Sequence, residues 1–175
     1  MLQRFYPDNE TDSAYDIDYR ALYGKGYRGI IFDIDNTLVP HGAPADDRAV
    51  KLFSILRKIG YHTVLLSNNK EPRVKPFADS VGSLYVFKAG KPGAKGYARA
   101  MKEMGTHPGN TIFVGDQLFT DVWGAKKAGI ITYLVKPIHP KEEIQIVLKR
   151  RLERIVLFFY HRRVNRGKIT SGTNG

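Results

Sequence analysis

Short apolar runs and longer amphipathic stretches alternate along the chain. The apolar runs cover residues 30–32, 62–66, 84–87, 111–114 and 130–135. Runs of this length predict strands that are buried on both faces, whereas the stretches between them repeat apolar residues at helical spacing. Strands that alternate with helices form βαβ units, so we expect an α/β fold with a Rossmann-like, doubly wound parallel sheet of five strands.

Glycines mark the ends of the predicted helices. Gly60, Gly82, Gly105 and Gly129 each follow the last apolar position of a helical stretch. Glycine is favoured just past a helix end because it adopts the left-handed conformation found there without steric cost. We therefore expect helices that end at these four glycines. Residues 8–27, which mix acids with tyrosines, are expected to form a short helix and a turn that pack on the body.

The C-terminal segment has the same helical spacing but a different composition. Apolar residues recur there every three or four positions, at Ile144, Leu148, Leu152, Ile155 and Phe159. Lysines and arginines flank this stripe, and residues 155–160 are all apolar. We expect a basic amphipathic helix over about residues 140–163, appended to the core, and a disordered tail over residues 169–175.

The net charge of +11 is concentrated in the same segment. Residues 136–175 hold ten Lys or Arg against three Glu, so they contribute +7 of the total. This excess favours an anionic partner, and the functional interpretation is an interfacial helix on an anionic membrane surface. Two alternatives stay open. In the first, the apolar stripe packs against the sheet edge or a second subunit. In the second, the segment binds RNA, for which the sequence offers no recognised motif.

Length and composition are those of one folded domain. The 175 residues are 42% hydrophobic, and we expect a single domain over residues 1–168 with a core at about 27–136. The absence of cysteine excludes disulfides and thiolate metal sites, and no stretch has the pattern of a signal peptide or the length of a membrane span. We therefore expect a cytoplasmic protein, peripheral at the membrane if its basic helix binds lipid.

Polar residues follow four of the predicted strands, at the point where each strand ends. In chain order they are Asp33 and Asp35, then Ser67 and Asn68, then Lys91, then Asp116 and Asp121. The carboxyl ends of parallel strands meet at one edge of a sheet, where such folds bind their ligands. Unpaired buried carboxylates are costly, so acids at the tip of a buried strand indicate chemistry rather than folding. Carboxylates, a hydroxyl and an ammonium group are the components of phosphoryl transfer through an aspartyl-phosphate.

Taken in order, these groups resemble the four motifs of the haloacid dehalogenase (HAD) superfamily of phosphohydrolases. The motifs are carried by Asp33-Ile34-Asp35-Asn36-Thr37, by Ser67, by Lys91, and by Gly115-Asp116 with Asp121. The sequences Asp-Asn-Thr-Leu, Leu-Ser-Asn-Asn and Lys-Pro around them are similar to those of the YqeG-type HAD IIIA phosphatases. That family is similar to the phosphatidylglycerophosphate phosphatases of mitochondria and plastids. The resemblance covers most of the body of the chain and implies a HAD-like phosphatase fold.

The resemblance also implies a role for each residue. Asp33 would attack phosphorus, and Asp35 would protonate the leaving oxygen and later take a proton from the hydrolytic water. The phosphoryl group would be bound by Thr37, Ser67, Asn68 and Lys91. Lys91 would in addition offset the negative charge of the nucleophile.

A Mg²⁺ ion is implied by the same resemblance. Its ligands would be Asp33, Asp116 and the main-chain carbonyl of Asp35, with Asp121 supporting them through water or Lys91. A phosphate dianion at ~4 Å from several carboxylates would be repelled by several kcal/mol even at an effective dielectric constant of about 20, so the site needs a divalent cation. An all-oxygen ligand set favours Mg²⁺ over zinc.

The spacing of the motifs excludes a receiver domain and a cap domain. Receiver domains are also doubly wound and phosphorylated on aspartate, but that aspartate follows a later strand, and here Ser67 and Lys91 follow the second and third strands. The gaps from Thr37 to Ser67 and from Ser67 to Lys91 each leave room for a helix and a strand with their loops. We therefore expect a capless, open site that suits a phosphate carried on a large or surface-embedded substrate.

The sequence thus predicts a Mg²⁺-dependent phosphomonoester phosphatase, with phosphatidylglycerophosphate as the leading substrate. A phosphatase of a sugar or nucleotide phosphate is the nearest alternative. An RNA- or ribosome-associated adaptor with a vestigial site is the alternative from another class, and the intact set of acids argues against it.

Overall fold

The computed structural model describes residues 2–139 and 144–170, with backbone alone at 144–149 and 166–170. The strands are β1 (Asn9–Thr11), β2 (Gly29–Phe32), β3 (His62–Leu66), β4 (Leu84–Val86), β5 (Thr111–Gly115) and β6 (Ile131–Val135). The α-helices are α1 (Tyr19–Gly24), α2 (Asp47–Ile59), α3 (Glu71–Val81), α4 (Ala94–Met104), α5 (Trp123–Lys127) and α6 (Ile144–Thr170). Shorter helical turns are η1 (Leu2–Phe5), η2 (Ala14–Asp16), η3 (Pro108–Asn110) and η4 (Leu118–Val122), the last with π-helical geometry.

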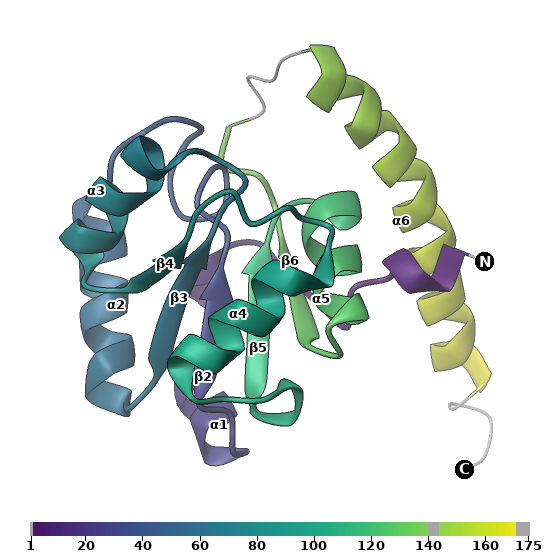
Figure 1. Ribbon diagram of the computed structural model, residues 1–175. Helices are drawn as coiled ribbons and strands as arrows, with labels where there is room; N and C mark the ends of the chain where they lie inside the picture. The colour runs from purple at the N-terminus through teal and green to yellow at the C-terminus, as the bar shows by residue number, and fades with distance from the viewer. Residues whose placement is uncertain (1, 140–143, 171–175) are drawn as a thin grey trace.

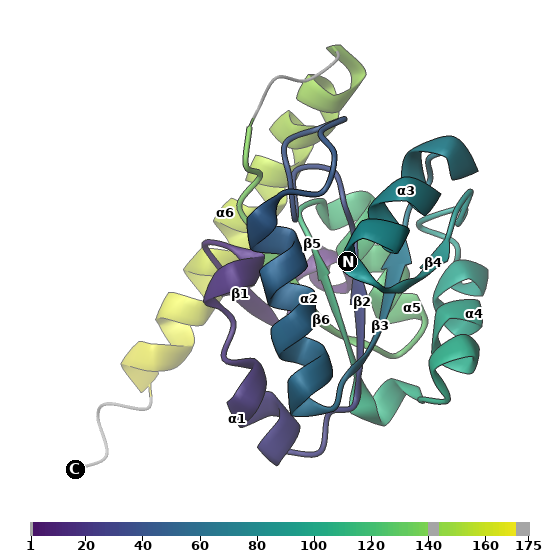
Figure 2. The ribbon, with the colours of Figure 1, turned by 90° about the vertical axis from the view of Figure 1, so that its left-hand side faces the viewer.

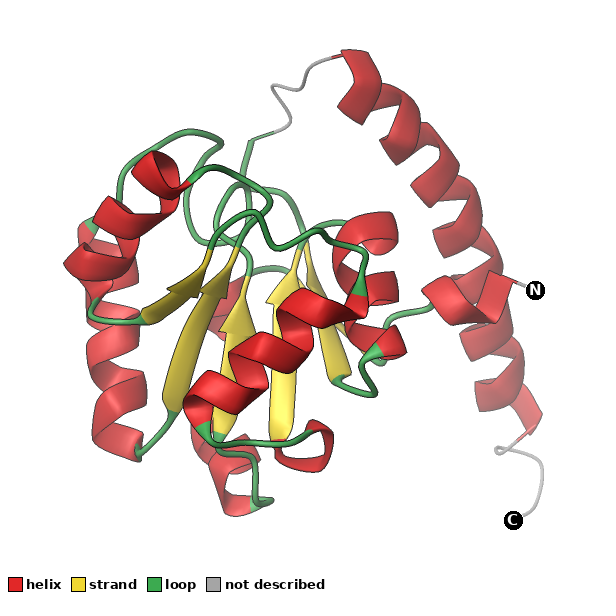
Figure 3. Ribbon diagram, in the orientation of Figure 1, coloured by secondary structure: helices red, strands yellow, loops and turns green. Residues whose placement is uncertain are grey.

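The strands form one parallel sheet in the order β1-β6-β5-β2-β3-β4 (Figures 1 and 3). This confirms the doubly wound α/β fold. The expected number of five strands was wrong, because Asn9–Thr11 adds a sixth strand beside β6, where a short helix and a turn were expected. β2 lies between β5 and β3, so the strand that precedes Asp33 and Asp35 lies inside the sheet.

Successive residues of β2 face opposite sides of the sheet and belong to different cores. Ile30 and Phe32 pack with residues of α1, α2 and α3, whereas Ile31 packs with residues of α4 and α5. Figure 2 shows α1 and α2 on one side of the sheet and α4 and α5 on the other. Burial on both faces explains why β2 is apolar throughout rather than alternating.

Gly60 is an example of the helix ends that the sequence predicts. It follows α2 in the left-handed conformation, with φ 114°, and a Cβ at this position would lie 2.6 Å from the Tyr23 hydroxyl oxygen. Both the backbone angle and the close contact require glycine. The predicted ends of α3 at Gly82 and of α4 at Gly105 are also confirmed.

α6 begins beyond the carboxyl edge of the sheet and runs back along the molecule on the side of β1 and β6 (Figure 1). Its buried Val156 packs with Leu118, Val122 and Leu134, so one face of the helix is docked on the body. The helix continues to Thr170, past the expected end at about residue 163. Residues 171–175 of the predicted disordered tail lie outside the described residues. Within the described part of the chain, no helix combines the length and apolar character needed to cross a bilayer.

Candidate active site

The side chains expected to form the site come from four loops at the carboxyl edge of the sheet. The backbone N–H of Asp33 donates to the Val114 carbonyl at 2.9 Å and that of Ser67 to the Val86 carbonyl at 3.0 Å. Sheet pairing therefore continues one residue beyond these strands and fixes where the loops start. These loops bring the candidate residues together at the carboxyl edge of the sheet, which is the edge expected from the sequence.

Lys91 joins the third loop to the first and the fourth. Its Nζ donates to Asp33 Oδ1 at 2.6 Å and to Asp121 Oδ1 at 2.7 Å, and its side chain is 5% exposed. Three buried charged groups thus share one centre. The backbone N–H of Gln117 donates to the other Asp121 oxygen at 3.1 Å, which leaves this carboxylate with a partner on each oxygen.

Asp116 and Thr37 complete this centre. The Thr37 hydroxyl lies 3.3 Å from Asp116 Oδ1 and 3.4 Å from Asp33 Oδ2, between the two carboxylates. The second Asp116 oxygen accepts a 2.7 Å hydrogen bond from the guanidinium of Arg150, which comes from α6. The side chain of Asp116 is fully buried, so this ion pair lies at the floor of the site rather than on its surface.

Burial and mutual repulsion make these carboxyls weak acids. Burial raises the pKa of Asp33 to about 8, because the nearby Asp121 and Asp116 carboxylates act in the same direction while Lys91 opposes them. Burial likewise raises the pKa of Asp116 to about 7, with Asp121 adding to the rise and Arg150 opposing it. Burial alone would lower the pKa of Lys91, but the facing carboxylates outweigh it and raise the pKa above its ordinary value. The site therefore holds more negative charge than its cations offset.

The acidic cluster suits a hard divalent cation. Asp33, Asp116 and Asp121 each offer a carboxylate oxygen, and these oxygens lie within 4.8 Å of one another. Oxygen ligands of this kind suit Mg²⁺. Carboxylates crowded together without a cation between them are expected to have raised pKa values, as Asp33 and Asp116 do. The residues present thus fit the implied metal.

Asp35 is not part of this cluster. Its Oδ1 accepts from Arg73 at 2.8 Å and from the Gly42 backbone N–H at 2.8 Å, and its Oδ2 accepts from Asn69 at 2.8 Å. The Asp35 side chain lies outside the group of three carboxylates that could hold a metal. These three hydrogen bonds hold the Asp35 carboxylate in one orientation.

Ser67 and Asn68 follow β3 as expected. The buried Ser67 hydroxyl accepts from the Asn69 N–H at 3.1 Å, which leaves its own hydrogen available to an acceptor. The Asn68 side chain binds the backbone of Lys91 twice, accepting from its N–H at 2.8 Å and donating to its carbonyl at 3.1 Å. Asn68 thereby positions the loop that carries Lys91.

Local sequence explains how the first and fourth loops take their shapes. Asn36 adopts φ 62°, a left-handed conformation that asparagine tolerates better than most residues, and this turns the chain directly after Asp35. In the fourth loop, the Tyr97 hydroxyl donates to the carbonyls of Thr120 and Asp121 at 3.0 and 3.1 Å. Tyr97 thus binds two backbone carbonyls of the π-helical turn η4 and helps to hold that turn in place.

Sequence reasoning missed Arg73, Asn69 and Arg150. Arg73 lies in the first turn of α3, where the helix dipole disfavours a cation, and this unfavourable position was a signal that an acid faces it. Asn69 belongs to the second motif but had no assigned role. Arg150 was grouped with the basic residues that flank the apolar stripe, and nothing in the periodicity of α6 distinguishes it from them.

Comparison with known proteins identifies the family. A family model described as haloacid dehalogenase-like hydrolase matches residues 41–129. The probable phosphatase YqeG of Bacillus subtilis is 35% identical over 159 residues, which cover 90% of this chain and 92% of that protein. The chloroplastic phosphatidylglycerophosphate phosphatase 1 of Chlamydomonas reinhardtii is 30% identical over 148 residues, covering 78% of this chain and 55% of that protein.

Two solved structures share the fold. The cobalt-bound deoxy-D-mannose-octulosonate 8-phosphate phosphatase of Haemophilus influenzae has a TM-score of 0.51 at 17% identity, covering 62% of this chain and 68% of that one. A hypothetical protein of Xanthomonas campestris has a TM-score of 0.55 at 16% identity, covering 74% of this chain and 76% of that one. The predicted resemblance is confirmed: the chain belongs to the haloacid dehalogenase-like hydrolases and is an HAD-type phosphatase.

Proposed function

We propose that this phosphatase is Mg²⁺-dependent, transfers the phosphoryl group to Asp33, and has phosphatidylglycerophosphate as its leading substrate. The observation that carries the mechanism is the shared centre of Lys91, Asp33 and Asp121, with N–O distances of 2.6 and 2.7 Å. A lysine in this position reduces the charge on a nucleophile and on the group that it attacks. Asp33, Asp116 and Asp121 would hold the cation.

The proposed reaction has two steps, phosphoryl transfer to Asp33 and hydrolysis of the resulting acyl-phosphate, and named residues would act in each. Asp33 Oδ2, whose partner is the distant Thr37 hydroxyl at 3.4 Å, is the oxygen less committed to a cation and would attack phosphorus. Asp35, whose oxygens accept from Arg73, Gly42 and Asn69 in this structure, would have to turn toward Asp33 and take up a proton. It would then give that proton to the leaving alkoxide and later accept one from the water that hydrolyses the acyl-phosphate. The Ser67 hydroxyl and Lys91 would bind the phosphoryl oxygens. The chemistry that Mg²⁺ supplies when bound is neutralisation of the charge on those oxygens in the transition state.

Two lines of support favour a lipid-borne phosphate. The loops between the motifs hold one helix and one strand each, with no inserted domain between β2 and β3 or between β3 and β4. A site without a cap suits a phosphate presented by something larger than the site. In addition, the Chlamydomonas relative is named for phosphatidylglycerophosphate.

The exposed face of α6 supports an anionic membrane as the partner surface. Large apolar side chains stay exposed on it, at Leu152, Ile155, Phe158 and Phe159. Exposed arginines flank them, at Arg151, Arg154, Arg162 and Arg163. Apolar residues edged by cations are the pattern of helices that lie in the interface of an anionic bilayer.

Phosphate release from a panel of substrates tests the enzymatic proposal. The panel holds an aryl phosphate, a sugar phosphate, a nucleotide and phosphatidylglycerophosphate, each with Mg²⁺ and with a chelator. We expect turnover only when Mg²⁺ is present, and the highest kcat/KM on the lipid. Asp33→Asn should lower kcat by roughly 10³-fold or more. The matched control is Asp79→Asn, an exposed aspartate on α3, which should retain activity. Release that persists in Asp33→Asn would refute the covalent route.

Sedimentation with vesicles tests the membrane partner separately. We expect the protein to bind vesicles of phosphatidylglycerol but not of phosphatidylcholine, with binding weakened by salt. Leu152→Asp should abolish this binding, whereas Leu84→Asp, at a leucine of similar exposure on the opposite edge strand, should not. Equal binding to both vesicle types, or equal loss in both variants, would contradict the proposal.

A further inference from the structure

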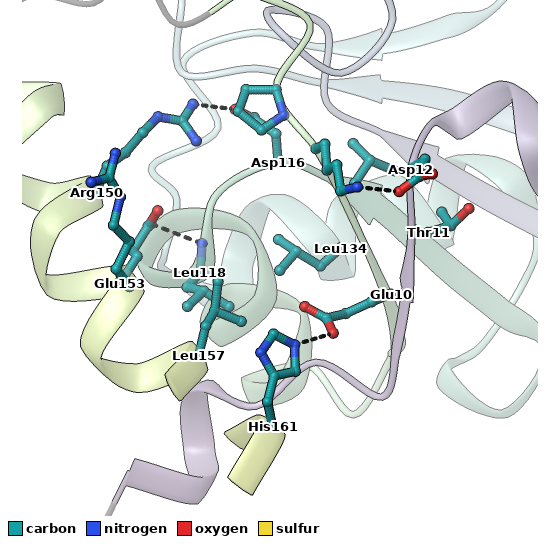
Figure 4. A pocket seen from close by; sticks show the side chains of 14 residues that line it. Glu10, Thr11, Asp12, Asp116, Leu118, Leu134, Arg150, Glu153, Leu157 and His161 are labelled. Carbon is teal, nitrogen blue, oxygen red and sulfur yellow. Dashed lines mark hydrogen bonds and ion pairs between the residues drawn. The ribbon is translucent and has the colours of Figure 1, made fainter. Parts of the chain in front are cut away.

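Two arginines from different helices each bind one carboxylate of the candidate site. Arg150 of α6 donates to Asp116 Oδ2 at 2.7 Å (Figure 4), and Arg73 of α3 donates to Asp35 Oδ1 at 2.8 Å. Asp116 belongs to the cluster of three carboxylates, whereas Asp35 does not. Arg150 therefore binds a carboxylate of the reaction centre, and Arg73 binds one that lies outside it.

The Asp35 carboxylate is bound by donors from three segments of the chain. Besides Arg73, the Gly42 backbone N–H donates to Oδ1 and the Asn69 side chain donates to Oδ2, each at 2.8 Å. The side chain of Asp35 is 13% exposed and that of Arg73 is 21% exposed, so solvent and salt screen this ion pair less than a surface pair. Both oxygens are thus held, and the side chain has a defined resting position.

Asn69 is fixed in place by its own backbone. Its N–H donates to Ser67 Oγ at 3.1 Å, and its carbonyl accepts from the Lys88 N–H at 2.9 Å. The side-chain amide that binds Asp35 is therefore anchored to the loops that follow β3 and β4. The resting position of Asp35 is built into the second motif and does not depend on a loose surface side chain.

Arg73 occupies a place that disfavours a cation. It lies in the first turn of α3, at the positive end of the helix dipole, and the Asp35 carboxylate offsets that cost. Its buried Nε–H meets no acceptor among the residues that the structure describes, which leaves a donor unsatisfied while the contact lasts. Rotation of the partly exposed guanidinium into water would hydrate this donor. The contact with Asp35 can therefore be released.

The cluster of carboxylates explains why Asp35 rests outside it. Asp33, Asp116 and Asp121 already crowd one centre, and a fourth carboxylate beside them would be repelled. A general acid, however, must lie within hydrogen-bond reach of the oxygen that leaves phosphorus, and phosphorus is attacked by Asp33 in the proposed reaction. The resting position and the working position of Asp35 are therefore different.

We propose that Arg73 is a positioning residue that, with Asn69, holds Asp35 in its resting position, and that release of this contact limits how often Asp35 reaches the leaving oxygen. The inference rests on the proposed function, in which Asp35 protonates the leaving group. It adds one conformational step, in which Asp35 leaves Arg73 and turns toward Asp33 before the P–O bond breaks. No covalent bond changes in this step. The proton that Asp35 takes up from solvent passes to the leaving oxygen when that bond breaks.

The dependence of the rate on the leaving group tests this step. The substrates are ring-substituted phenyl phosphates, which are alike around phosphorus but release phenolates of different basicity. A strongly basic phenolate needs a proton in order to leave and a weakly basic one does not. The slope of log(kcat/KM) against the pKa of the leaving phenol therefore reports how effective the acid is. Because kcat/KM covers only the steps up to release of the phenol, hydrolysis of the acyl-phosphate does not enter.

Arg73→Met removes the charged donors and keeps much of the apolar stem. We expect it to raise kcat/KM roughly tenfold for the most basic leaving group and to flatten the slope, because a charge-assisted hydrogen bond no longer holds Asp35. Arg73→Lys should restore most of the wild-type slope, and Asn69→Ala should flatten it less than Arg73→Met, because a neutral donor binds a carboxylate more weakly. The matched control is Arg99→Met, which removes an exposed arginine paired with Glu103 at 2.8 Å on α4 and should leave the slope unchanged.

An unchanged slope in Arg73→Met would overturn the proposal. A steeper slope would also overturn it, because Arg73 would then bring Asp35 to the leaving oxygen instead of holding it back. Asp35→Asn identifies a failure of the proposed function, since it should give the steepest slope of the series. If its slope equals that of the wild type, Asp35 is not the acid, and the resting contact is then judged by a measurement without catalysis.

A double-mutant cycle in thermal unfolding is that measurement. It compares wild type, Arg73→Met, Asp35→Asn and the double variant, first free and then with Mg²⁺ and orthovanadate, which can adopt the five-coordinate geometry of phosphoryl transfer. In the free protein the two substitutions should be non-additive by about 3 °C or more in Tm. With orthovanadate the non-additivity should fall below about 1 °C, because Asp35 has left Arg73. Additive effects in the free protein would overturn the resting contact, and non-additivity that persists with orthovanadate would overturn its release.

Discussion

Without a metal ion, the protein should lose stability as the pH rises, and the Asp33 carboxyl should account for much of that loss. Burial, together with the Asp121 and Asp116 carboxylates, raises the pKa of Asp33 from 3.8 to about 8. Between these values the folded state keeps a proton that the unfolded state has released. The stabilisation from this proton is complete below about pH 4 and is lost as the pH rises through about 8. Replacing Asp33 by Asn removes the titrating group.

The expected size of the effect follows from the same environment. A rise of this size in pKa corresponds to several kcal/mol at about 1.4 kcal/mol per pKa unit, and the loss of the Lys91 ion pair in the variant offsets part of it. We expect metal-free Asp33→Asn to be more stable than the wild type by about 2 kcal/mol near pH 8, which is about 4–8 °C in Tm for a chain of this length. Near pH 5 the two proteins should differ much less.

Thermal unfolding followed by circular dichroism measures this difference. Wild type and Asp33→Asn are melted from about pH 5 to about pH 8 in chelator and again in excess Mg²⁺. Mg²⁺ should reverse the order, because a ligand at 100 times its Kd stabilises by about 2.7 kcal/mol and the variant lacks one of the carboxylates. Asp79→Asn, which removes an exposed ion pair with Lys75, should change stability by no more than about 0.5 kcal/mol.

Parallel pH profiles for wild type and Asp33→Asn in chelator would refute the reasoning. They would mean that the Asp33 carboxyl titrates as it does in the unfolded chain. The crowding of the carboxylates would then not be the source of the affinity for a cation.

Three further substitutions test how the site and the core are held. Gly115→Ala would place a Cβ 2.6 Å from Asp121 Oδ2, so phosphatase kcat should fall at least roughly tenfold while Mg²⁺ binding weakens in the same variant. Phe53→Ala removes a fully buried ring from the core beneath α2 and should cost about 3–5 kcal/mol in chemical unfolding, with little change in the slope against denaturant. Glu153→Ala leaves the buried Leu118 N–H without its acceptor and should cost about 1–3 kcal/mol, with faster hydrogen exchange of that amide. Normal exchange at Leu118 in Glu153→Ala would show that the carboxylate does not hold this turn.

The fold followed from periodicity because β2, β3 and β5 are buried along nearly their whole length, and α2, α3 and α4 each bury one apolar face. The strand that was missed is Asn9–Thr11, three polar residues with no apolar run. It becomes a strand by pairing with Tyr133, Leu134 and Val135 of β6 rather than through its own composition. Edge strands of this kind depend on tertiary contacts that periodicity cannot report.

The candidate site was predictable where residues follow strand ends, since topology brings those ends together. Asp33, Lys91 and Asp121 could therefore be placed near one another from the order of motifs. The partners of Asp116 and Asp35 could not, because they depend on how whole helices pack. Arg150 reaches Asp116 only because α6 docks with the face that carries Arg150 inward. The sequence of α6 is apolar on both its docked and its exposed side, so it does not indicate which face docks.

Arg150 and Glu153 come from a segment that follows the last strand and lies outside residues 41–129, the stretch that the family model matches. A chain that ended at residue 129 would keep Asp116 and Asp121. It would lose Arg150, which donates to Asp116, and Glu153, which accepts from the Leu118 N–H. The stretch that the family model matches is therefore smaller than the unit that forms the site, which includes Asp33 before that stretch and α6 after it. Relatives that share the sheet but not the helix would be expected to hold their fourth loop by other means.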